Sequence, residues 1–262
     1  MIKSVIAAVK EVAAREIMPR YLSVAHSRKA DGSLLTEADL ATQTVLKEML
    51  RGIRDCPVIG EEMTREEQAE SWLAGSEGLW CIDPIDGTSN FVNGVPYFAV
   101  SVALMEGGRS VLGVVYDPVA GEAFYAERGK GAYLNDERLP IKTNAPLLYQ
   151  AMASVDFKRL PPQLACELAG TPPYASARNF GACALEWCYT AAGRFDLYLH
   201  GGMKLWDYAA GALILEEAGG CMATLRNADF WSDGLWQRSV VAALDAALFG
   251  QWQGWIRAHH SE

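Results

Sequence analysis

Two different patterns of apolar residues divide this sequence, and they restrict its fold more than any other feature. Three strand-like runs follow one another in the middle of the chain, at 97–105, 110–116 and 122–127. Because Gly-Gly and Asp-Pro turn signals separate these runs, they predict an antiparallel meander. Further on, strand-like runs near 150–155, 174–180, 195–199, 221–225 and 238–243 alternate with helix-like segments at 160–169, 182–192, 206–218 and 245–258. This alternation is typical of α/β structure.

The change of pattern predicts where the chain divides. Pro140 and Asn144-Ala145-Pro146 interrupt both patterns, and such residues mark turns and loops. We therefore predict an α/β (α+β) chain, with an N-terminal α+β half over residues 1–145 and a C-terminal α/β half over residues 146–262.

The segments before the meander predict two helices and two short strands. Apolar residues at helical spacing indicate a helix over 2–24. Thr36 can cap a second helix over about 37–53, with Asp39 in its first turn, and short apolar runs indicate strands at 57–59 and 79–82. The polar, acidic stretch 62–77 between those strands is interpreted as a surface excursion.

Composition restricts the class of function. The chain has 262 residues, half of them hydrophobic, and a formal net charge of −9, so no binding of nucleic acid is expected. Its six cysteines include no C-x-x-C pair, which favours free thiols in a reducing compartment. Charged residues interrupt the apolar N-terminus, and no run reaches the ~18 apolar residues of a membrane-spanning helix. We expect a soluble, cytoplasmic protein without membrane contact.

One short segment carries the strongest chemical signal. Asp83-Pro84-Ile85-Asp86-Gly87-Thr88 follows a hydrophobic strand, so the turn can direct two carboxylates and a backbone carbonyl into one cavity. Pro84 fixes one backbone angle, and Gly87 permits a close approach of the backbone to a ligand. Hard cations such as Mg²⁺ prefer oxygen ligands of this kind. The segment therefore predicts a metal site, in preference to a turn with two solvated aspartates.

With its neighbours, this segment resembles the inositol monophosphatase family of metal-dependent, lithium-sensitive phosphatases. The resemblance rests on W-C-I-D-P-I-D-G-T-S-N-F at 80–91, on Gly60-Glu61-Glu62 before it, and on L-W-D-Y-A-A-G at 205–211 continued by E-E-A-G-G at 216–220. It implies a layered αβαβα sugar-phosphatase fold, Mg²⁺ as cofactor, a small phosphorylated substrate and a homodimer.

The resemblance also implies the metal ligands. Glu61, Asp83 and the carbonyl of Ile85 would hold one ion, and Asp83, Asp86 and Asp207 a second. Glu61 would also help to hold a third, hydrated ion. Clustered cations of this kind offset the charge of a phosphate monoester, lower the pKa of a bound water and stabilise the leaving oxygen.

Two further residues receive catalytic roles by the same resemblance. Thr88 would orient the attacking water, and Asp39 would hydrogen-bond the Thr88 hydroxyl. The backbone N–H groups of Gly87 and Thr88 would hold the phosphate. From the sequence alone, Asp39 has a simpler explanation, since an acidic residue in the first turn of a helix is favoured by the helix dipole.

The predicted substrate pocket departs from the family pattern. It would be lined by Gly181, Ala182, Cys183, His200 and Asp207. Animal inositol monophosphatases have a glutamate seven residues before the second-motif aspartate, where this chain has His200, and Ala182 lacks a hydroxyl that family members use. A neutral imidazole cannot replace a carboxylate as acceptor for two hydroxyls. His200 is therefore interpreted either as a contact to a different substrate or as a packing residue. Lys29 matches a basic position near the family's active site, although most lysines are solvated surface residues.

Several functions stay open at this stage. The first is hydrolysis of an inositol-1-phosphate-like monoester by a metal-activated water. The same scaffold hosts phosphatases of 3′(2′),5′-bisphosphate nucleotides, fructose 1,6-bisphosphate and histidinol phosphate. The alternative of another class is a regulatory, protein-binding partner of the transcription machinery, as in some bacterial relatives, with the acidic stretch 62–77 as a candidate contact surface.

Overall fold

The structure is a computed structural model that describes residues 1–23, 26–28, 34–142 and 147–260. Lys29 and the predicted boundary between residues 145 and 146 lie outside these ranges. The division into two halves stays a prediction. In the described part of the chain, no helix is both long enough and apolar enough to cross a membrane.

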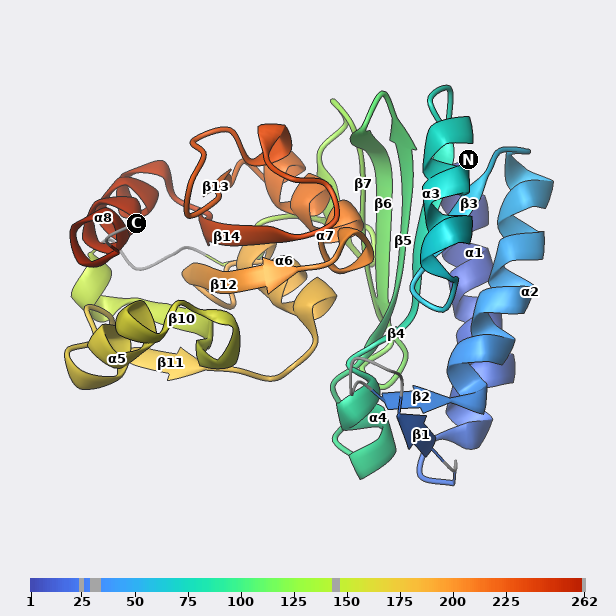
Figure 1. The fold of residues 1–262 in the computed structure, drawn as a ribbon, viewed down its shortest axis with the longest axis horizontal. Helices are drawn as coiled ribbons and strands as arrows, with labels where there is room; N and C mark the ends of the chain where they lie inside the picture. Colours follow the sequence, from blue (N-terminus) through green and yellow to red (C-terminus); the bar gives the residue numbers. More distant parts are fainter. Residues whose placement is uncertain (24–25, 29–33, 143–146, 261–262) are drawn as a thin grey trace.

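Five layers of helix and sheet build the molecule (Figure 1). Helices α1 (Ile2–Val12) and α2 (Glu37–Ile53) form the first layer, and a seven-stranded sheet forms the second. Helices α6 (Cys183–Ala191) and α7 (Leu205–Glu217) form the third layer and separate this sheet from a five-stranded sheet. Helices α5 (Pro162–Gly170) and α8 (Ala246–His259) cover the outer face of the second sheet. The predicted αβαβα layering is confirmed.

The seven-stranded sheet contains the predicted meander. Its strands run in chain order: β3 (Val58–Gly60), β4 (Leu79–Asp86), β5 (Ala99–Glu106), β6 (Arg109–Asp117), β7 (Glu122–Glu127), β8 (Ala132–Leu134) and β9 (Glu137–Arg138). Only the β3–β4 pair is parallel. Every residue of β4 is buried, because helices cover both faces of the sheet. The strand that leads into the predicted metal motif therefore lies in the centre of the core.

The five-stranded sheet has a mixed order. Its strands lie in the sequence β11 (Ser176–Arg178), β10 (Met152–Asp156), β12 (Leu197–Met203), β14 (Arg238–Ala243) and β13 (Cys221–Ala223). β10 runs parallel to both β11 and β12, while β14 runs antiparallel to β12 and β13. The register pairs Asp156 on β10 with His200 on β12, which brings two polar side chains together at one end of the sheet.

Helices α6 and α7 belong to one hydrophobic core with both sheets. Tyr198 of β12, Trp187 of α6 and Val115 of β6 are members of the same buried cluster. Two glycines allow the close packing: a Cβ on Gly211 would collide with the Cβ of Trp187, and one on Gly113 would lie 2.8 Å from the carbonyl oxygen of Ala210. A larger residue at either position would push the layers apart.

Several elements differ from the prediction. The stretch 62–77 contains helix α3 (Arg65–Ala74), because the side chains of Thr64 and Glu67 form a capping box at its start. A short helix, α4 (Thr88–Asn93), follows the metal motif. The N-terminal helix was predicted over 2–24, but its α-helical part ends at Val12. A π-helical turn at Ala13–Ile17 and a 3₁₀ turn at Met18–Arg20 follow it.

The remaining elements are short. Strands β1 (His26–Arg28) and β2 (Leu34–Thr36) form a separate two-stranded sheet before α2. Further 3₁₀ turns lie at Leu148–Gln150, Phe157–Arg159 and Phe230–Ser232.

Candidate active site

A sharp turn carries the end of β4 into helix α4. Gly87 begins this turn with a φ of +89°, which side chains other than glycine rarely adopt. The site also has little room, because a Cβ on Gly87 would lie 3.1 Å from the Cβ of Ala182 and 3.2 Å from the carbonyl oxygen of Tyr97. The turn therefore needs glycine for both its conformation and its packing. It holds the motif backbone against the loop that precedes α6.

Three of the predicted metal ligands converge at the end of β4. Asp83, Asp86 and Asp207 each place one carboxylate oxygen so that all three oxygens lie within 4.8 Å of one another. Asp207 comes from the first turn of α7, and its Oδ2 accepts a hydrogen bond from the backbone N–H of Lys204 at 2.8 Å. Asp86 is fixed by the first backbone N–H groups of α6, from Cys183 at 3.2 Å and Ala184 at 2.7 Å.

Asp83, Asp86 and Asp207 are called the acidic group below, and their electrostatics favour a bound cation. Burial raises the pKa of Asp83 and Asp86 well above their usual range, and the neighbouring carboxylates raise both further. Burial, together with the charge of Glu61, raises the pKa of Asp207 to about 7. Three ionised carboxylates so close together are costly without a counter-charge. Oxygen donors in this arrangement, buried at Asp83 and Asp86 and half-buried at Asp207, fit a hard divalent cation such as Mg²⁺.

Glu61 and Ile85 lie beside this acidic group. Glu61 follows β3, and its charge contributes to the raised pKa of both Asp83 and Asp207. The backbone N–H of Ile85 donates to Asp83 Oδ1 at 3.1 Å, and its carbonyl oxygen accepts a hydrogen bond from the Thr88 hydroxyl at 3.0 Å. Both residues thus stand next to the acidic group, and their role as metal ligands stays a prediction.

Asp39 faces Thr88 across the site while it also caps a helix. Its Oδ2 accepts hydrogen bonds from the backbone N–H and the hydroxyl of Thr36, at 2.7 and 2.6 Å. Its Oδ1 lies 3.5 Å from the Thr88 hydroxyl oxygen, which is long for a hydrogen bond. The Thr88 hydroxyl therefore donates to Ile85 in this structure and has Asp39 as its second, more distant neighbour.

The loop before α6 brings the predicted pocket residues next to the motif. Gly181 has a φ of +78°, and Ala182 is fully buried against Gly87. Glu186, which the sequence analysis missed, holds this loop because its Oε1 accepts hydrogen bonds from the N–H groups of Phe180 and Gly181, at 3.0 and 3.3 Å. Burial raises the pKa of Glu186 to about 7. Its presence among the apolar residues of α6 was the signal that could have identified it.

His200 lies at the edge of the site with its ring nitrogens engaged. Nε2 lies 3.2 Å from Asp156 Oδ2 and 3.6 Å from Cys183 Sγ, and Nδ1 accepts the N–H of Gly202 at 3.1 Å. The side chain of His200 is 4 % exposed, against 18 % for Asp156. Sequence reasoning missed Asp156, whose place at the end of a strand became informative only through its pairing with His200.

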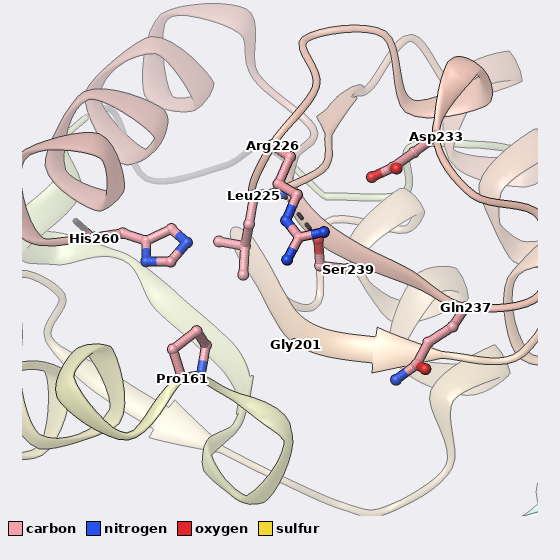
Figure 2. Close-up of a pocket in the computed structure, with 8 residues that line it drawn as sticks. All are labelled: Pro161, Gly201, Leu225, Arg226, Asp233, Gln237, Ser239 and His260. Atoms are coloured by element: carbon pink, nitrogen blue, oxygen red, sulfur yellow. Dashed lines mark hydrogen bonds between the residues drawn. The ribbon is translucent and has the colours of Figure 1, made fainter. Parts of the chain in front are cut away.

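A separate cavity of about 750 Å³ lies in the C-terminal part of the molecule (Figure 2). Its lining comes from β12, β14, the segment after β13 and the ends of α5 and α8: Pro161, Gly201, Leu225, Arg226, Asp233, Gln237, Ser239 and His260. The hydroxyl oxygen of Ser239 accepts a hydrogen bond from the Leu225 N–H at 2.9 Å. None of the predicted site residues lines this cavity, so it is distinct from the candidate active site.

Comparison with known proteins identifies the family to which the chain is similar. The family model described as the inositol monophosphatase family matches residues 1–258. "Nus factor SuhB" of Pasteurella multocida is 40 % identical over 73 % of this chain and 72 % of its own length. "Inositol-1-monophosphatase" of Caulobacter vibrioides is 34 % identical over 83 % of this chain and 85 % of its own length.

Solved structures agree with the sequence comparison. The crystal structure of the extragenic suppressor protein suhB from Bartonella henselae is similar, with a TM-score of 0.83 and 27 % identity, and the match covers 97 % of each chain. The layered fold, the acidic group and the match along the sequence agree, and the chain belongs to the inositol monophosphatase family.

Proposed function

We propose that this protein hydrolyses a small phosphate monoester, inositol-1-phosphate-like, with Mg²⁺ as cofactor and a water molecule as nucleophile. The observation that carries the proposal is the convergence of Asp83, Asp86 and Asp207 at the end of β4. Buried carboxylates with raised pKa values are common at catalytic sites. Family membership supports phosphatase chemistry, and the relative named inositol-1-monophosphatase supports the class of substrate.

The proposal gives each residue near the acidic group a defined task. Divalent cations at the carboxylates would offset the phosphate charge and make a bound water more acidic. Asp39 would orient the Thr88 hydroxyl, which in turn would orient the attacking water. The backbone N–H groups of Gly87 and Thr88, at the start of α4, would bind phosphate oxygens, because the first N–H groups of a helix have no partner within it.

Phosphate release from a substrate panel, with Mg²⁺ and with EDTA, tests the proposal. The panel contains inositol 1-phosphate, adenosine 3′,5′-bisphosphate, fructose 1,6-bisphosphate and histidinol phosphate. We expect Mg²⁺-dependent release that is highest with inositol 1-phosphate. Release that persists in EDTA, or no release from any compound by folded protein, would contradict the proposal.

A second candidate function is contact with the transcription machinery. It is favoured by the relative named as a Nus factor. The surface that α3 shares with Trp236 offers a contact, since Leu73 of α3 is 81 % and Trp236 42 % exposed, and the ring of Trp236 packs against Trp72 of α3. Binding to purified RNA polymerase should weaken in Leu73→Asp while phosphate release stays unchanged. Absence of binding by the native chain would remove this candidate.

Two further expectations belong with this proposal. A homodimer and a cytoplasmic location both follow from the resemblance and the composition, and both stay predictions. Light scattering after size-exclusion chromatography would give the mass, to be compared with 28.6 kDa for one chain.

A further inference from the structure

A second polar group lies beside the acidic group, joined to it by Cys183. The backbone N–H of Cys183 binds Asp86, and its Sγ lies 3.6 Å from His200 Nε2. The same Nε2 lies 3.2 Å from Asp156 Oδ2. Burial raises the pKa of the Cys183 thiol, and the charges of Asp207, Asp86 and Asp156 contribute to the rise. Cys183 therefore lies between the acidic group and the Asp156–His200 pair and contacts both.

The hydrogen bonds of His200 fix its tautomer. Nδ1 accepts the backbone N–H of Gly202, so in the neutral ring the proton resides on Nε2. That Nε2–H points at the Asp156 carboxylate. A ring bound in this way has no acceptor left for a substrate hydroxyl, and it is almost fully buried. His200 therefore holds Asp156 in place.

Asp156 has the accessibility and the acceptor capacity that His200 lacks. Its Oδ1 accepts the backbone N–H of Lys158 at 2.9 Å, and its Oδ2 accepts the Nε2–H of His200. An ionised carboxylate offers about four acceptor positions, so two donors leave capacity for a ligand. Burial alone would raise the pKa of Asp156, but the hydrogen bond from His200, together with the Lys158 N–H and the charge of Arg159, outweighs it and holds the pKa below its usual range. The group is thus an oriented, ionised and partly exposed acceptor.

We propose that Asp156 is a specificity-determining residue that accepts hydrogen bonds from hydroxyl groups on the body of the substrate, with His200 as its positioning residue. This rests on the proposed phosphatase function and narrows its substrate to polyhydroxylated monoesters. An acceptor-only carboxylate binds O–H donors and repels a second phosphate. Arg159 is exposed, and its positive charge lowers the pKa of both Asp156 and Asp207. It therefore offsets part of the negative charge of these two carboxylates.

The test compares kcat/KM for inositol 1-phosphate with kcat/KM for p-nitrophenyl phosphate, which has no hydroxyl group on its body. In Asp156→Asn, we expect this ratio to fall about 10- to 100-fold, since hydrogen bonds to a charged group are worth about 1.5–3 kcal/mol. The loss should be mainly in KM for inositol 1-phosphate. Asp245→Asn is the matched control, because Asp245 is exposed on the same half and caps α8, where asparagine serves equally well.

Variants of His200 separate positioning from packing. His200→Gln keeps an N–H donor for Asp156, whereas His200→Leu does not, so the substrate ratio should fall less in the glutamine variant. If the leucine variant fails to fold, the glutamine variant, provided that it shows a native unfolding transition, is compared with the native protein instead.

The remaining outcomes distinguish this inference from the proposed function. An unchanged substrate ratio in Asp156→Asn, or a native preference for a bisphosphate, would overturn the inference while the phosphatase function stands. Failure of the native protein to hydrolyse either compound would overturn both.

Discussion

Asp83 affects the stability of the fold and the proposed chemistry in opposite ways. It is 1 % exposed, and its pKa is raised by burial and by the charges of Glu61, Asp86 and Asp207. An ionised side chain in that position destabilises the protein unless a cation balances it. Stability and the proposed chemistry are therefore opposed at this residue, so that the same substitution should move them in opposite directions.

Asp83→Asn should lower Mg²⁺-dependent phosphate release more than about 100-fold, since ligand-shell changes of lesser severity already cost 10–100-fold. In EDTA the same variant should be more stable than the native chain by about 1–3 kcal/mol, because one buried charge is removed and Oδ1 can still accept the Ile85 N–H. Urea denaturation and phosphate release give the two values. Asp55→Asn, at an exposed position, is the control; equal activity in both variants would exclude Asp83 as a ligand.

Glu186 should make stability depend on pH. Its folded pKa is about 7, against an ordinary value of 4.5. As the pH rises, the unfolded chain therefore loses this proton at a lower pH than the folded protein does. The contribution of Glu186 to stability is therefore fully present below pH 4.5 and is lost as the pH rises to about 7. Glutamine cannot ionise but can still accept from the N–H groups of Phe180 and Gly181.

The free energy of unfolding of Glu186→Gln, relative to the native chain, should increase by roughly 2–3 kcal/mol between pH 5 and pH 8. Urea denaturation at each pH measures it, with the exposed Glu77→Gln as control. A difference that does not change with pH would mean that Glu186 is already ionised in the folded protein at pH 5.

The turn between β4 and α4 is the element on which the candidate site depends. Gly87 combines a left-handed backbone with contacts to Ala182 and Tyr97 that leave little room for a side chain. The turn sets the direction of α4 and the position of the Thr88 hydroxyl. A change at Gly87 should therefore affect both folding and chemistry.

Gly87→Ala should destabilise the protein by more than Gly121→Ala, and it should reduce phosphate release. Gly121 has a similar φ of +68°, but a Cβ there would meet nothing within 4 Å, so the substitution costs only the ~1–2 kcal/mol of a left-handed alanine. The excess in Gly87→Ala measures the close packing of the motif. Equal losses in the two variants would show that the contacts to Ala182 and Tyr97 relax freely.

The elements that the sequence predicted share a physical property, which is agreement between local and tertiary signals. The predicted and observed bounds of α2 are both 37–53, because a cap at Thr36 and an apolar stripe mark the same segment. Helices α3 and α4 were missed, since α3 is mostly exposed and α4 spans six residues, and neither carries an apolar stripe. Asp83, Asp86 and Asp207 were expected together through the family resemblance. Asp156 and Glu186 depend on partners that only the fold brings near.

Helices α6 and α7 pack against both sheets and so connect the two parts of the molecule. They supply one wall of the core for each sheet, and they also carry Cys183 and Asp207 to the site. Their mutual distance is set by Gly211, whose missing side chain lets α7 approach Trp187. The geometry of the acidic group thus depends on packing between these two helices.

Gly211→Ala should destabilise the protein by about 1–3 kcal/mol or more, because the added methyl group has no space against Trp187. Gly250→Ala in α8, where nothing lies within 4 Å, should instead stabilise it by about 0.5–1 kcal/mol, as alanine favours a helix. Thermal unfolding measures both. Similar effects of the two substitutions would show that α6 and α7 can separate without cost.

The shared middle layer also has a consequence for biosynthesis. The seven-stranded sheet is complete by Arg138, yet the helices that cover its second face begin only at Cys183 and end at Glu217. While the ribosome is still adding those residues, the emerging chain exposes a broad apolar surface that can associate with other nascent chains. Slow translation between these positions would lengthen that exposure, so the yield of folded protein should respond to codon usage there and to the supply of chaperones.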